Sequence, residues 1–136
     1  MIVVVDSDGL IGVSNAQDTH YLASLSLIQR LNQKKVKYLY PATTIAEATA
    51  ILQIRLNKPD TANQIIESVK LGLFHIEPVD REILVSATTF LKGSVSKHIT
   101  LFDAIVAAMA QKYHADAIFS FDKFYKKIGF KLAGDL

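Results

Sequence analysis

The sequence of 136 residues contains no cysteine and only six glycines and three prolines. Without cysteine, disulfide bonds, thiolate metal sites and cysteine nucleophiles are excluded, so any chemistry must use oxygen or imidazole groups. The chain also lacks a glycine-rich phosphate-binding loop and a nucleophile-elbow serine, and its four histidines do not have the spacing of a metal site. The composition, with 50% hydrophobic and 21% charged residues, is typical of a compact globular protein and predicts one domain over residues 1–136.

Long hydrophobic runs are missing as well. The apolar run Ile2–Val5 directly follows Met1, and it lacks both the basic leader and the length of a signal peptide or a membrane span. We therefore expect a cytoplasmic protein with no membrane partner. The formal net charge of +2 is too small to indicate a nucleic-acid partner by itself.

The distribution of positive charge is more informative than the total. Basic and aromatic residues gather near the C-terminus: Lys123, Phe124, Tyr125, Lys126, Lys127, Phe130 and Lys131. Such a cluster could bind phosphates and stack bases, which makes Lys123, Lys126 and Lys127 candidate RNA-binding residues. The alternative interpretation is a solvated surface over aromatic residues that belong to the core.

Segments that favour strands alternate with segments that favour helices. Strands are predicted at residues 2–5, 36–40, 73–76 and 117–121, with a short fifth strand near 130–132. Helices are predicted at residues 19–34, 44–56, 60–72, 80–93 and 100–113, with a polar connection at 94–99. In the first helix, Leu22, Leu25, Ile28 and Leu31 recur every three positions as one apolar stripe. The alternation predicts an α/β fold, a three-layer α/β/α sandwich around a mainly parallel sheet of four to five strands.

Four acidic residues occupy unusual positions in this pattern. Asp6 and Asp122 each follow an apolar strand, and the carboxyl ends of parallel strands meet at one edge of a sheet. Asp103 is the only charged residue between positions 99 and 110, and Glu47 lies in a run of small and apolar residues. Four carboxylates brought together would repel one another, and a divalent cation is the simplest group that would stabilise them all in the ionised form.

Each of these acids also has a purely structural interpretation. Thr44 with Glu47, and Thr100 with Asp103, have the spacing of a capping box, so either carboxylate could cap its helix. Asp6 and Asp122 could be turn residues at strand ends that bind the backbone.

Four segments together resemble a known family. They are VVVDSDGLIG at residues 3–12, TTIAEATAIL at 43–52, TLFDAIVAAMA at 100–110 and IFSFDKFYKKIGF at 118–130. Their order and spacing resemble the PIN domain family over nearly the whole chain, and more narrowly the VapC-type toxins of bacterial and archaeal toxin/antitoxin pairs. The resemblance implies a PIN-like fold and an endoribonuclease that hydrolyses RNA with Mg²⁺ or Mn²⁺.

The resemblance also implies roles for individual residues. The catalytic residues and metal ligands would be Asp6, Glu47, Asp103 and Asp122. The supporting residues would be Ser7, Asp8 and Ser120. The implied partners are an RNA substrate, a second copy of the chain in a homodimer, and a small antitoxin protein.

One departure from the family pattern keeps two alternatives open. After Asp6 and Ser7 the family most often carries asparagine or serine and then an aliphatic residue, whereas this chain has Asp8 and Gly9. A strand followed by this sequence also resembles the opening motif of haloacid-dehalogenase-type phosphatases, in which Asp6 would be a nucleophile. The second alternative is a regulatory or binding module without catalytic activity, in which the acids only cap helices.

Overall fold

The computed structural model describes residues 1–92 and 98–136. It contains a four-stranded sheet with the order β3-β2-β1-β4, in which each neighbouring pair is parallel. The strands are β1 (Ile2–Val5), β2 (Lys37–Pro41), β3 (Ile76–Glu77) and β4 (Ala117–Phe119). The α-helices are α1 (Ser7–Ser14), α2 (Tyr21–Gln33), α3 (Ala42–Ala50), α4 (Pro59–Lys70), α5 (Arg81–Leu91), α6 (Leu101–Lys112) and α7 (Phe124–Lys127). A π-helix (Ile51–Arg55) continues α3, and a 3₁₀ turn (Ala133–Asp135) lies near the C-terminus.

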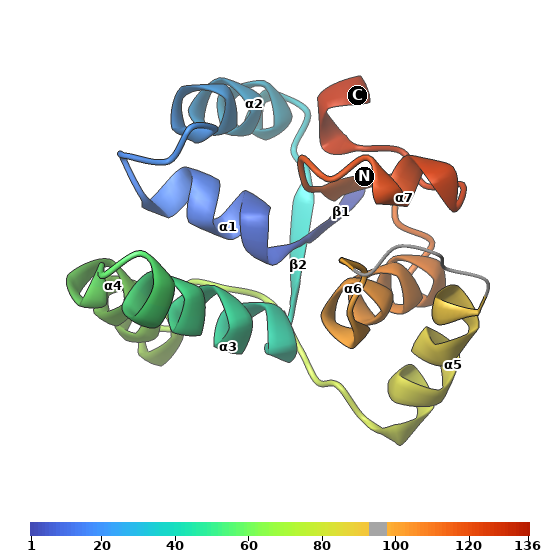
Figure 1. The fold of residues 1–136 in the computed structure, drawn as a ribbon. Helices are drawn as coiled ribbons and strands as arrows, with labels where there is room; N and C mark the ends of the chain where they lie inside the picture. Colours follow the sequence, from blue (N-terminus) through green and yellow to red (C-terminus); the bar gives the residue numbers. More distant parts are fainter. Residues whose placement is uncertain (93–97) are drawn as a thin grey trace.

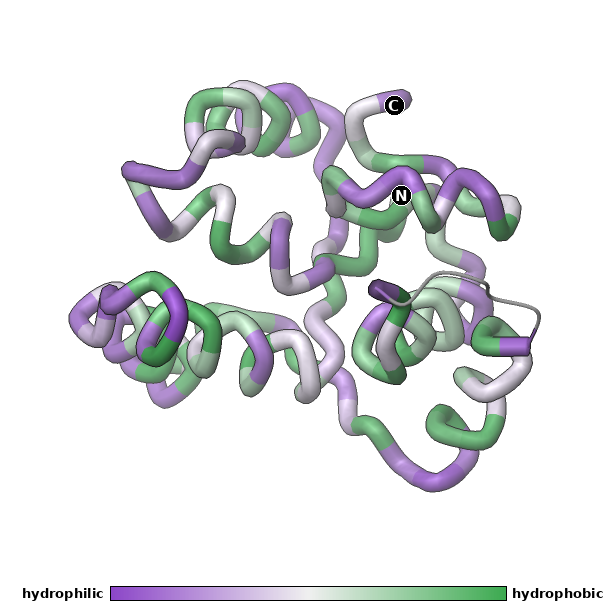
Figure 2. Tube along the Cα trace, viewed as in Figure 1, coloured by the Kyte–Doolittle hydropathy of each residue, from purple (hydrophilic) through white to green (hydrophobic). Residues whose placement is uncertain are grey.

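Two apolar layers cover the two faces of the sheet. Val4 of β1 packs with residues of α5, α6 and α7, whereas Val3 and Val5 pack with residues of α1, α2, α3 and α4. This follows from the alternation of side chains along a strand, which sends neighbouring residues to opposite faces. Figure 1 shows α1 to α4 on one side of the strands and α5 and α6 on the other, and in Figure 2 these helices carry hydrophobic and hydrophilic positions in alternation. The predicted three-layer parallel α/β fold is confirmed.

Several predicted boundaries were wrong. The strand predicted at residues 73–76 is β3 at Ile76–Glu77, and Phe74 instead packs its ring against Tyr40 at 4.7 Å between centroids. The segment predicted as a short fifth strand contributes one parallel bridge, Ile118 with Leu132. The strand predicted at 117–121 ends at Phe119. Residue 93 and most of the predicted polar connection at 94–99 lie outside the described residues.

The apolar stripe predicted on the first helix was also wrong. In α2 the buried residues are Ser24, Leu27 and Leu31, while Leu22 is 79% exposed. The reason is helical geometry: nine residues at about 3.6 per turn make two and a half turns, which puts Leu22 and Leu31 on opposite sides. A three-residue spacing therefore drifts around the helix.

Helix α1 was not predicted at all. Asp6 is its N-cap, and the side chain of Asp6 accepts a hydrogen bond from the amide of Ser7 at 2.7 Å. A Cβ atom at Gly9 would overlap the backbone carbonyl oxygen of Phe119, so glycine at this position permits α1 to lie directly on β4. The departure Asp8-Gly9 is thus part of a buried helix start that packs against the last strand.

Candidate active site

The carboxyl ends of β1 and β4 meet at one edge of the sheet. Val5 pairs with Phe119, and the amide of Asp6 donates to the carbonyl of Phe119 at 3.1 Å. Asp6 and Ser120, which follow these two residues, are therefore neighbours although they are 114 positions apart. This is the arrangement that the strand pattern predicts for a parallel sheet.

Asp6 is the most deeply buried acid of the predicted site, with 3% of its surface exposed. Its Oδ1 accepts from the amide of Ser7, and its Oδ2 lies 3.1 Å from Ser120 Oγ and 2.9 Å from Tyr125 Oη, both in donor positions. Burial, followed by the nearby charge of Asp8, raises the pKa of Asp6 well above its usual value, against the opposing effect of the Ser7 amide.

Asp8 lies two residues after Asp6, in the first turn of α1, and binds the segment that follows β4. Its Oδ2 accepts from the amide of Phe121 at 2.8 Å and lies 3.0 Å from Ser120 Oγ. The Ser120 hydroxyl thus lies between the carboxylates of Asp6 and Asp8. Burial raises the pKa of Asp8. Its Oδ1 is buried and has no hydrogen-bond partner among residues 1–92 and 98–136.

Glu47 faces the same edge from α3. The side chain of Ser7 bonds to Glu47 and lowers its pKa, but burial has the larger effect and raises it, with further contributions from the charges of Asp103 and Asp8. The capping interpretation of Glu47 was wrong, because α3 begins at Ala42 and Thr44 lies inside it. Thr44 instead donates its hydroxyl to the carbonyl of Val5 at 3.1 Å, which fixes α3 against the end of β1.

Asp103 does cap its helix. Its Oδ2 accepts from the amide of Thr100 at 2.7 Å and from the hydroxyl of Thr100 at 3.1 Å, so the predicted capping box is present. Burial raises the pKa of Asp103, and the charge of Asp122 adds to this shift. One side chain therefore both begins α6 and adds negative charge to the site.

Asp122 differs from the other acids in being exposed. Its Oδ1 accepts from the amide of Phe124 at 2.8 Å, which is the turn-type bond that the structural interpretation expects. Its own amide donates to Ser120 Oγ at 3.0 Å. Asp122 is nevertheless close enough for its charge to raise the pKa of both Asp8 and Asp103.

Five acids form one electrostatic cluster: Asp6, Asp8, Glu47, Asp103 and Asp122. The charge of each one raises the pKa of another member, or its own pKa is raised by the charge of another member. Their ligand atoms are all oxygen, which suits hard cations such as Mg²⁺ and Mn²⁺, and the buried unpartnered Oδ1 of Asp8 adds to the excess of acceptors. Across residues 1–92 and 98–136, however, no three Asp, Glu or His side chains stand in positions that would hold a metal ion as they are. The donor chemistry fits a divalent cation, and binding requires side-chain adjustment.

Tyr125 is a residue of the site that the sequence interpretation missed. Its side chain is fully buried and its hydroxyl bonds to Asp6, which together with burial raises the pKa of Tyr125 well above its usual value. The sequence suggested that Phe124 and Tyr125 could stack bases, but both belong to the core beside α6. A buried tyrosine needs a polar partner, and that requirement was the available signal.

The candidate RNA-binding lysines lie on α7 and just before it. Lys123, Lys126 and Lys127 are exposed, and Lys126 forms an ion pair with Asp135 at 2.8 Å. The interpretation as a solvated surface above core aromatics therefore describes Phe124 and Tyr125 correctly. Lys123 directly follows Asp122 in the sequence, so a positively charged surface adjoins the acidic cluster.

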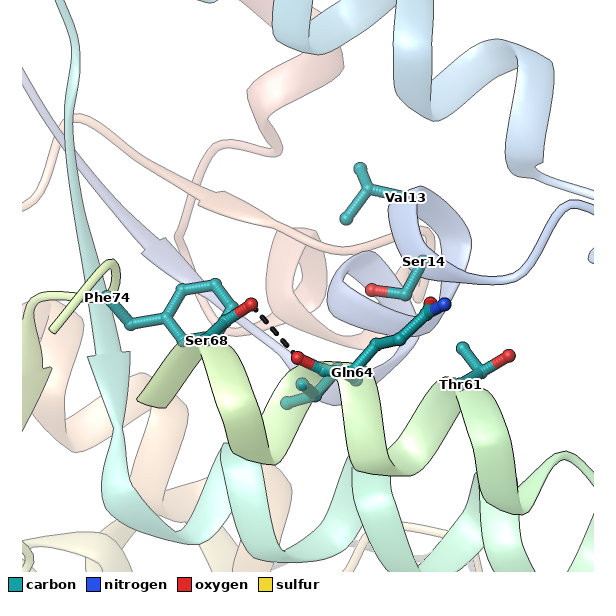
Figure 3. Close-up of a pocket in the computed structure, with 7 residues that line it drawn as sticks. Val13, Ser14, Thr61, Gln64, Ser68 and Phe74 are labelled. Atoms are coloured by element: carbon teal, nitrogen blue, oxygen red, sulfur yellow. Dashed lines mark hydrogen bonds between the residues drawn. The ribbon is translucent and has the colours of Figure 1, made fainter. Parts of the chain in front are cut away.

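A pocket of about 260 Å³ lies elsewhere, between the end of α1 and helix α4. Figure 3 shows its lining side chains, with Phe74 at one end and the hydroxyl of Ser68 bonded to the carbonyl of Gln64 at 3.0 Å. The pocket is lined by Val13, Ser14, Thr61, Gln64, Ile65, Ser68 and Phe74, none of which is a predicted site residue. None of the helices in the described ranges is long and apolar enough to cross a membrane.

Comparison with known proteins adds the family and the fold. The family model described as PIN domain matches residues 3–131. The structure is similar to that of VapC20 from Mycobacterium tuberculosis, a sarcin-ricin loop cleaving toxin, with 19% identity, a TM-score of 0.79 and coverage of 96% of each chain. It is also similar to FitAcB from Neisseria gonorrhoeae (20% identity, TM-score 0.67, 100% of both chains). A third similar structure is VapBC2 from Rickettsia felis bound to a promoter DNA fragment (17%, TM-score 0.59, 97% of this chain and 96% of that one). No curated protein matches the sequence.

Proposed function

The chain belongs to the PIN domain family, and from this premise we propose that it is an endoribonuclease that uses Mg²⁺ or Mn²⁺ to hydrolyse RNA phosphodiester bonds. Members of this family are nucleases. The observation that carries the proposal is the gathering of acids from β1, α3, α6 and the end of β4 at one edge of the sheet.

In the proposed mechanism, Asp6, Glu47, Asp103 and Asp122 would hold the cation directly or through water. Such a cation would lower the pKa of a bound water and withdraw charge from the scissile phosphate. Ser7, Asp8 and Ser120 orient the acids, and Tyr125 holds one oxygen of Asp6 by a hydrogen bond. The products would carry a 5′-phosphate and a 3′-hydroxyl.

We further propose that the protein is the toxin of a toxin/antitoxin pair. The similar structures include a sarcin-ricin loop cleaving toxin, VapBC2 bound to a DNA fragment from its promoter, and FitAB bound to an IR36 DNA fragment. By analogy, this chain would form a homodimer that a small antitoxin inhibits by placing its tail in the acidic groove, where an arginine would pair with the carboxylates. Light scattering tests the dimer, and toxicity on induced expression tests the toxin.

The cleavage reaction is tested by Asp6→Asn and Asp103→Asn. Both replacements keep the size of the side chain and remove one negative charge from the cluster, so we expect RNA cleavage to fall by at least about a hundredfold with the fold intact. Sequencing of RNA ends after induced expression of the wild type and Asp6→Asn would reveal activity, substrate and site together.

A matched control is Asp80→Asn, because Asp80 caps α5 through the amide of Ile83 as Asp103 caps α6. Asparagine is about as good an N-cap as aspartate, so this variant should keep its cleavage activity and lose at most about 0.5 kcal/mol of stability. Full metal-dependent activity in both Asp6→Asn and Asp103→Asn would contradict the assignment of these residues.

The phosphatase alternative is disfavoured by the surroundings of Asp6. The charges of Asp8 and Asp103 act on Asp6, and Glu47 lies near the same two acids, so a mechanism with Asp6 as the nucleophile leaves Glu47 and Asp103 without a role. The non-catalytic alternative predicts no binding of Mn²⁺, which calorimetry with the purified protein can measure.

A further inference from the structure

The loop that carries Asp122 is hydrogen-bonded to α1 through the side chain of Asp8, and Phe121 of the loop also packs against the apolar cluster that contains Leu10 and Ile11 of α1. Asp8 Oδ2 accepts from the amide of Phe121 and lies in bonding distance of the Ser120 hydroxyl. The amide of Asp122 then donates to the same hydroxyl. A continuous set of hydrogen bonds therefore runs from Asp8, through Ser120, to the backbone of Asp122.

Asp8 is itself held firmly. It lies in the first turn of α1, whose next residue, Gly9, is packed against the carbonyl of Phe119 so closely that a Cβ atom would overlap it. Phe119 is also the last residue of β4. The start of α1, which carries Asp8, and the start of the loop are thus both fixed at the end of β4.

Asp122, by contrast, is exposed and follows the strand after only two residues. Its side chain is bonded to the amide of Phe124 in its own turn. The hydrogen bonds that relate the loop to the other acids are made by Asp8 and Ser120, while Phe121 stacks on the ring of His20. Charge alone would drive Asp122 away from Asp103 and Asp8, since these carboxylates repel one another.

We propose that Asp8 is a positioning residue, which clamps the segment 120–122 so that Asp122 remains at the carboxylate cluster. Its Oδ2 is used by the loop, so the bonds that the Asp8 side chain makes are directed to segment 120–122. The role of Asp8 in the reaction rests on the proposed function, whereas the clamp itself is a property of the fold.

The clamp is tested by comparing Asp8→Asn with Asp8→Ala. The asparagine oxygen can still accept from the Phe121 amide, but alanine leaves that amide without its partner. In metal-free protein we expect hydrogen exchange at the Phe121 and Asp122 amides to be about tenfold or more faster in Asp8→Ala, and within about threefold of wild type in Asp8→Asn. Unchanged exchange in Asp8→Ala would overturn the clamp.

The action through Asp122 is tested by Mn²⁺ affinity, measured by calorimetry in a double-mutant cycle. We expect Asp8→Ala and Asp122→Asn each to weaken binding by about tenfold, and the double variant to be no weaker than either single variant. Additive losses would overturn the proposal, and so would an Asp8→Asn variant as weak as Asp8→Ala, because both results would mean that Asp8 acts on the cation independently of the loop, through its charge or as a ligand.

The clamp and the proposed function can be tested separately. If the wild type binds no Mn²⁺ and cleaves no RNA, the proposed function fails while the exchange measurement still decides whether the clamp exists. As a control for general loss of stability, Glu82→Ala changes an exposed acid in the first turn of α5 and should alter neither exchange at Phe121 nor Mn²⁺ affinity.

Discussion

Asp6 is a carboxyl group held where ionisation is unfavourable. It is almost fully buried, it lies near Asp8 and Asp103, and both effects raise its pKa. Hydrogen bonds from Ser7 and Tyr125 oppose this rise but do not cancel it. At the scale of single residues, the fold therefore disfavours the ionised form of Asp6, and a cation would supply the stabilisation that this form lacks.

The raised pKa of Asp6 predicts a pH dependence of stability. A raised pKa means that the folded protein keeps a proton which the unfolded chain has lost, so the contribution of Asp6 falls as pH rises from about 4 through the folded-state pKa. Asp6→Asn stays neutral at every pH. We expect its free energy of unfolding, relative to metal-free wild type, to increase over this range and then level off, by about 1.4 kcal/mol for each unit of raised pKa. Urea titrations between pH 4 and 8 would measure this difference.

Mn²⁺ provides the complementary measurement. At neutral pH the cation should raise the stability of the wild type, by about 1.4 kcal/mol for each tenfold excess over its dissociation constant, and should raise that of Asp6→Asn much less. In the metal-free urea titrations, a difference in free energy of unfolding between wild type and Asp6→Asn that stays constant from pH 4 to 8 would show that Asp6 ionises in the folded state without penalty.

The sequence singled out the acids by their positions, but it did not indicate the hydrogen bonds that surround them. Asp6 and Asp103 stood out because each follows or interrupts an apolar segment. The bonds of Asp8 to Phe121 and of Tyr125 to Asp6 could not be predicted, because they join residues more than 110 positions apart and depend on the depth at which α1 and α7 pack.

At the scale of elements, the packing of α1 on β4 determines how close Asp6 and Asp8 lie to the segment that follows β4. The first turn of this helix supplies Asp8, and its position on β4 depends on Gly9. Because the helix begins immediately after β1, a shift of α1 would move Asp6 and Asp8 together.

Gly9→Ala tests this close approach. Alanine would favour the helix by up to about 1 kcal/mol, but its Cβ would overlap the backbone oxygen of Phe119, which cannot rotate away. We expect a net loss of about 1 to 3 kcal/mol in the free energy of unfolding, together with weaker Mn²⁺ binding.

Gly134→Ala is the control for Gly9→Ala, since a Cβ at this position meets no heavy atom within 4 Å. Its stability should remain within about 0.5 kcal/mol of wild type. If the two variants had equal stability, the contact between α1 and β4 would not be as tight as the geometry requires.

Elements with a strong periodic pattern could be predicted, and those defined by pairing or packing could not. The buried strands β1 and β4 and the apolar helix α6 were recognisable from composition alone. The position of β3 was not, because a two-residue edge strand is defined only by its bonds to β2. Helix α1 has eight residues that include two glycines, so its sequence resembles a turn.

At the scale of the whole molecule, the alternation of strands and helices was sufficient to predict parallel layers. A parallel sheet requires a crossover between successive strands, and the chain has one or more helices in each gap. The same topology explains why acids from four distant segments reach one edge, since parallel strands all end on the same side. What the alternation cannot specify is which exposed residues face the substrate.

The charge distribution gives the last prediction, which concerns RNA binding by Lys123 and Lys127. Both are exposed and follow Asp122 closely, whereas Lys126 is bound to Asp135. An RNA backbone that reaches the acidic cluster would need such cations beside it, so replacing both lysines with alanine should weaken binding. The slope of log K against log salt should become shallower by about 0.7 for each phosphate that is no longer neutralised. Fluorescence anisotropy without divalent metal at several salt concentrations would measure this.

Lys112→Ala is the control, because it changes an exposed lysine at the opposite end of α6 from Asp103. An equal weakening in the control would mean that RNA senses only the total charge.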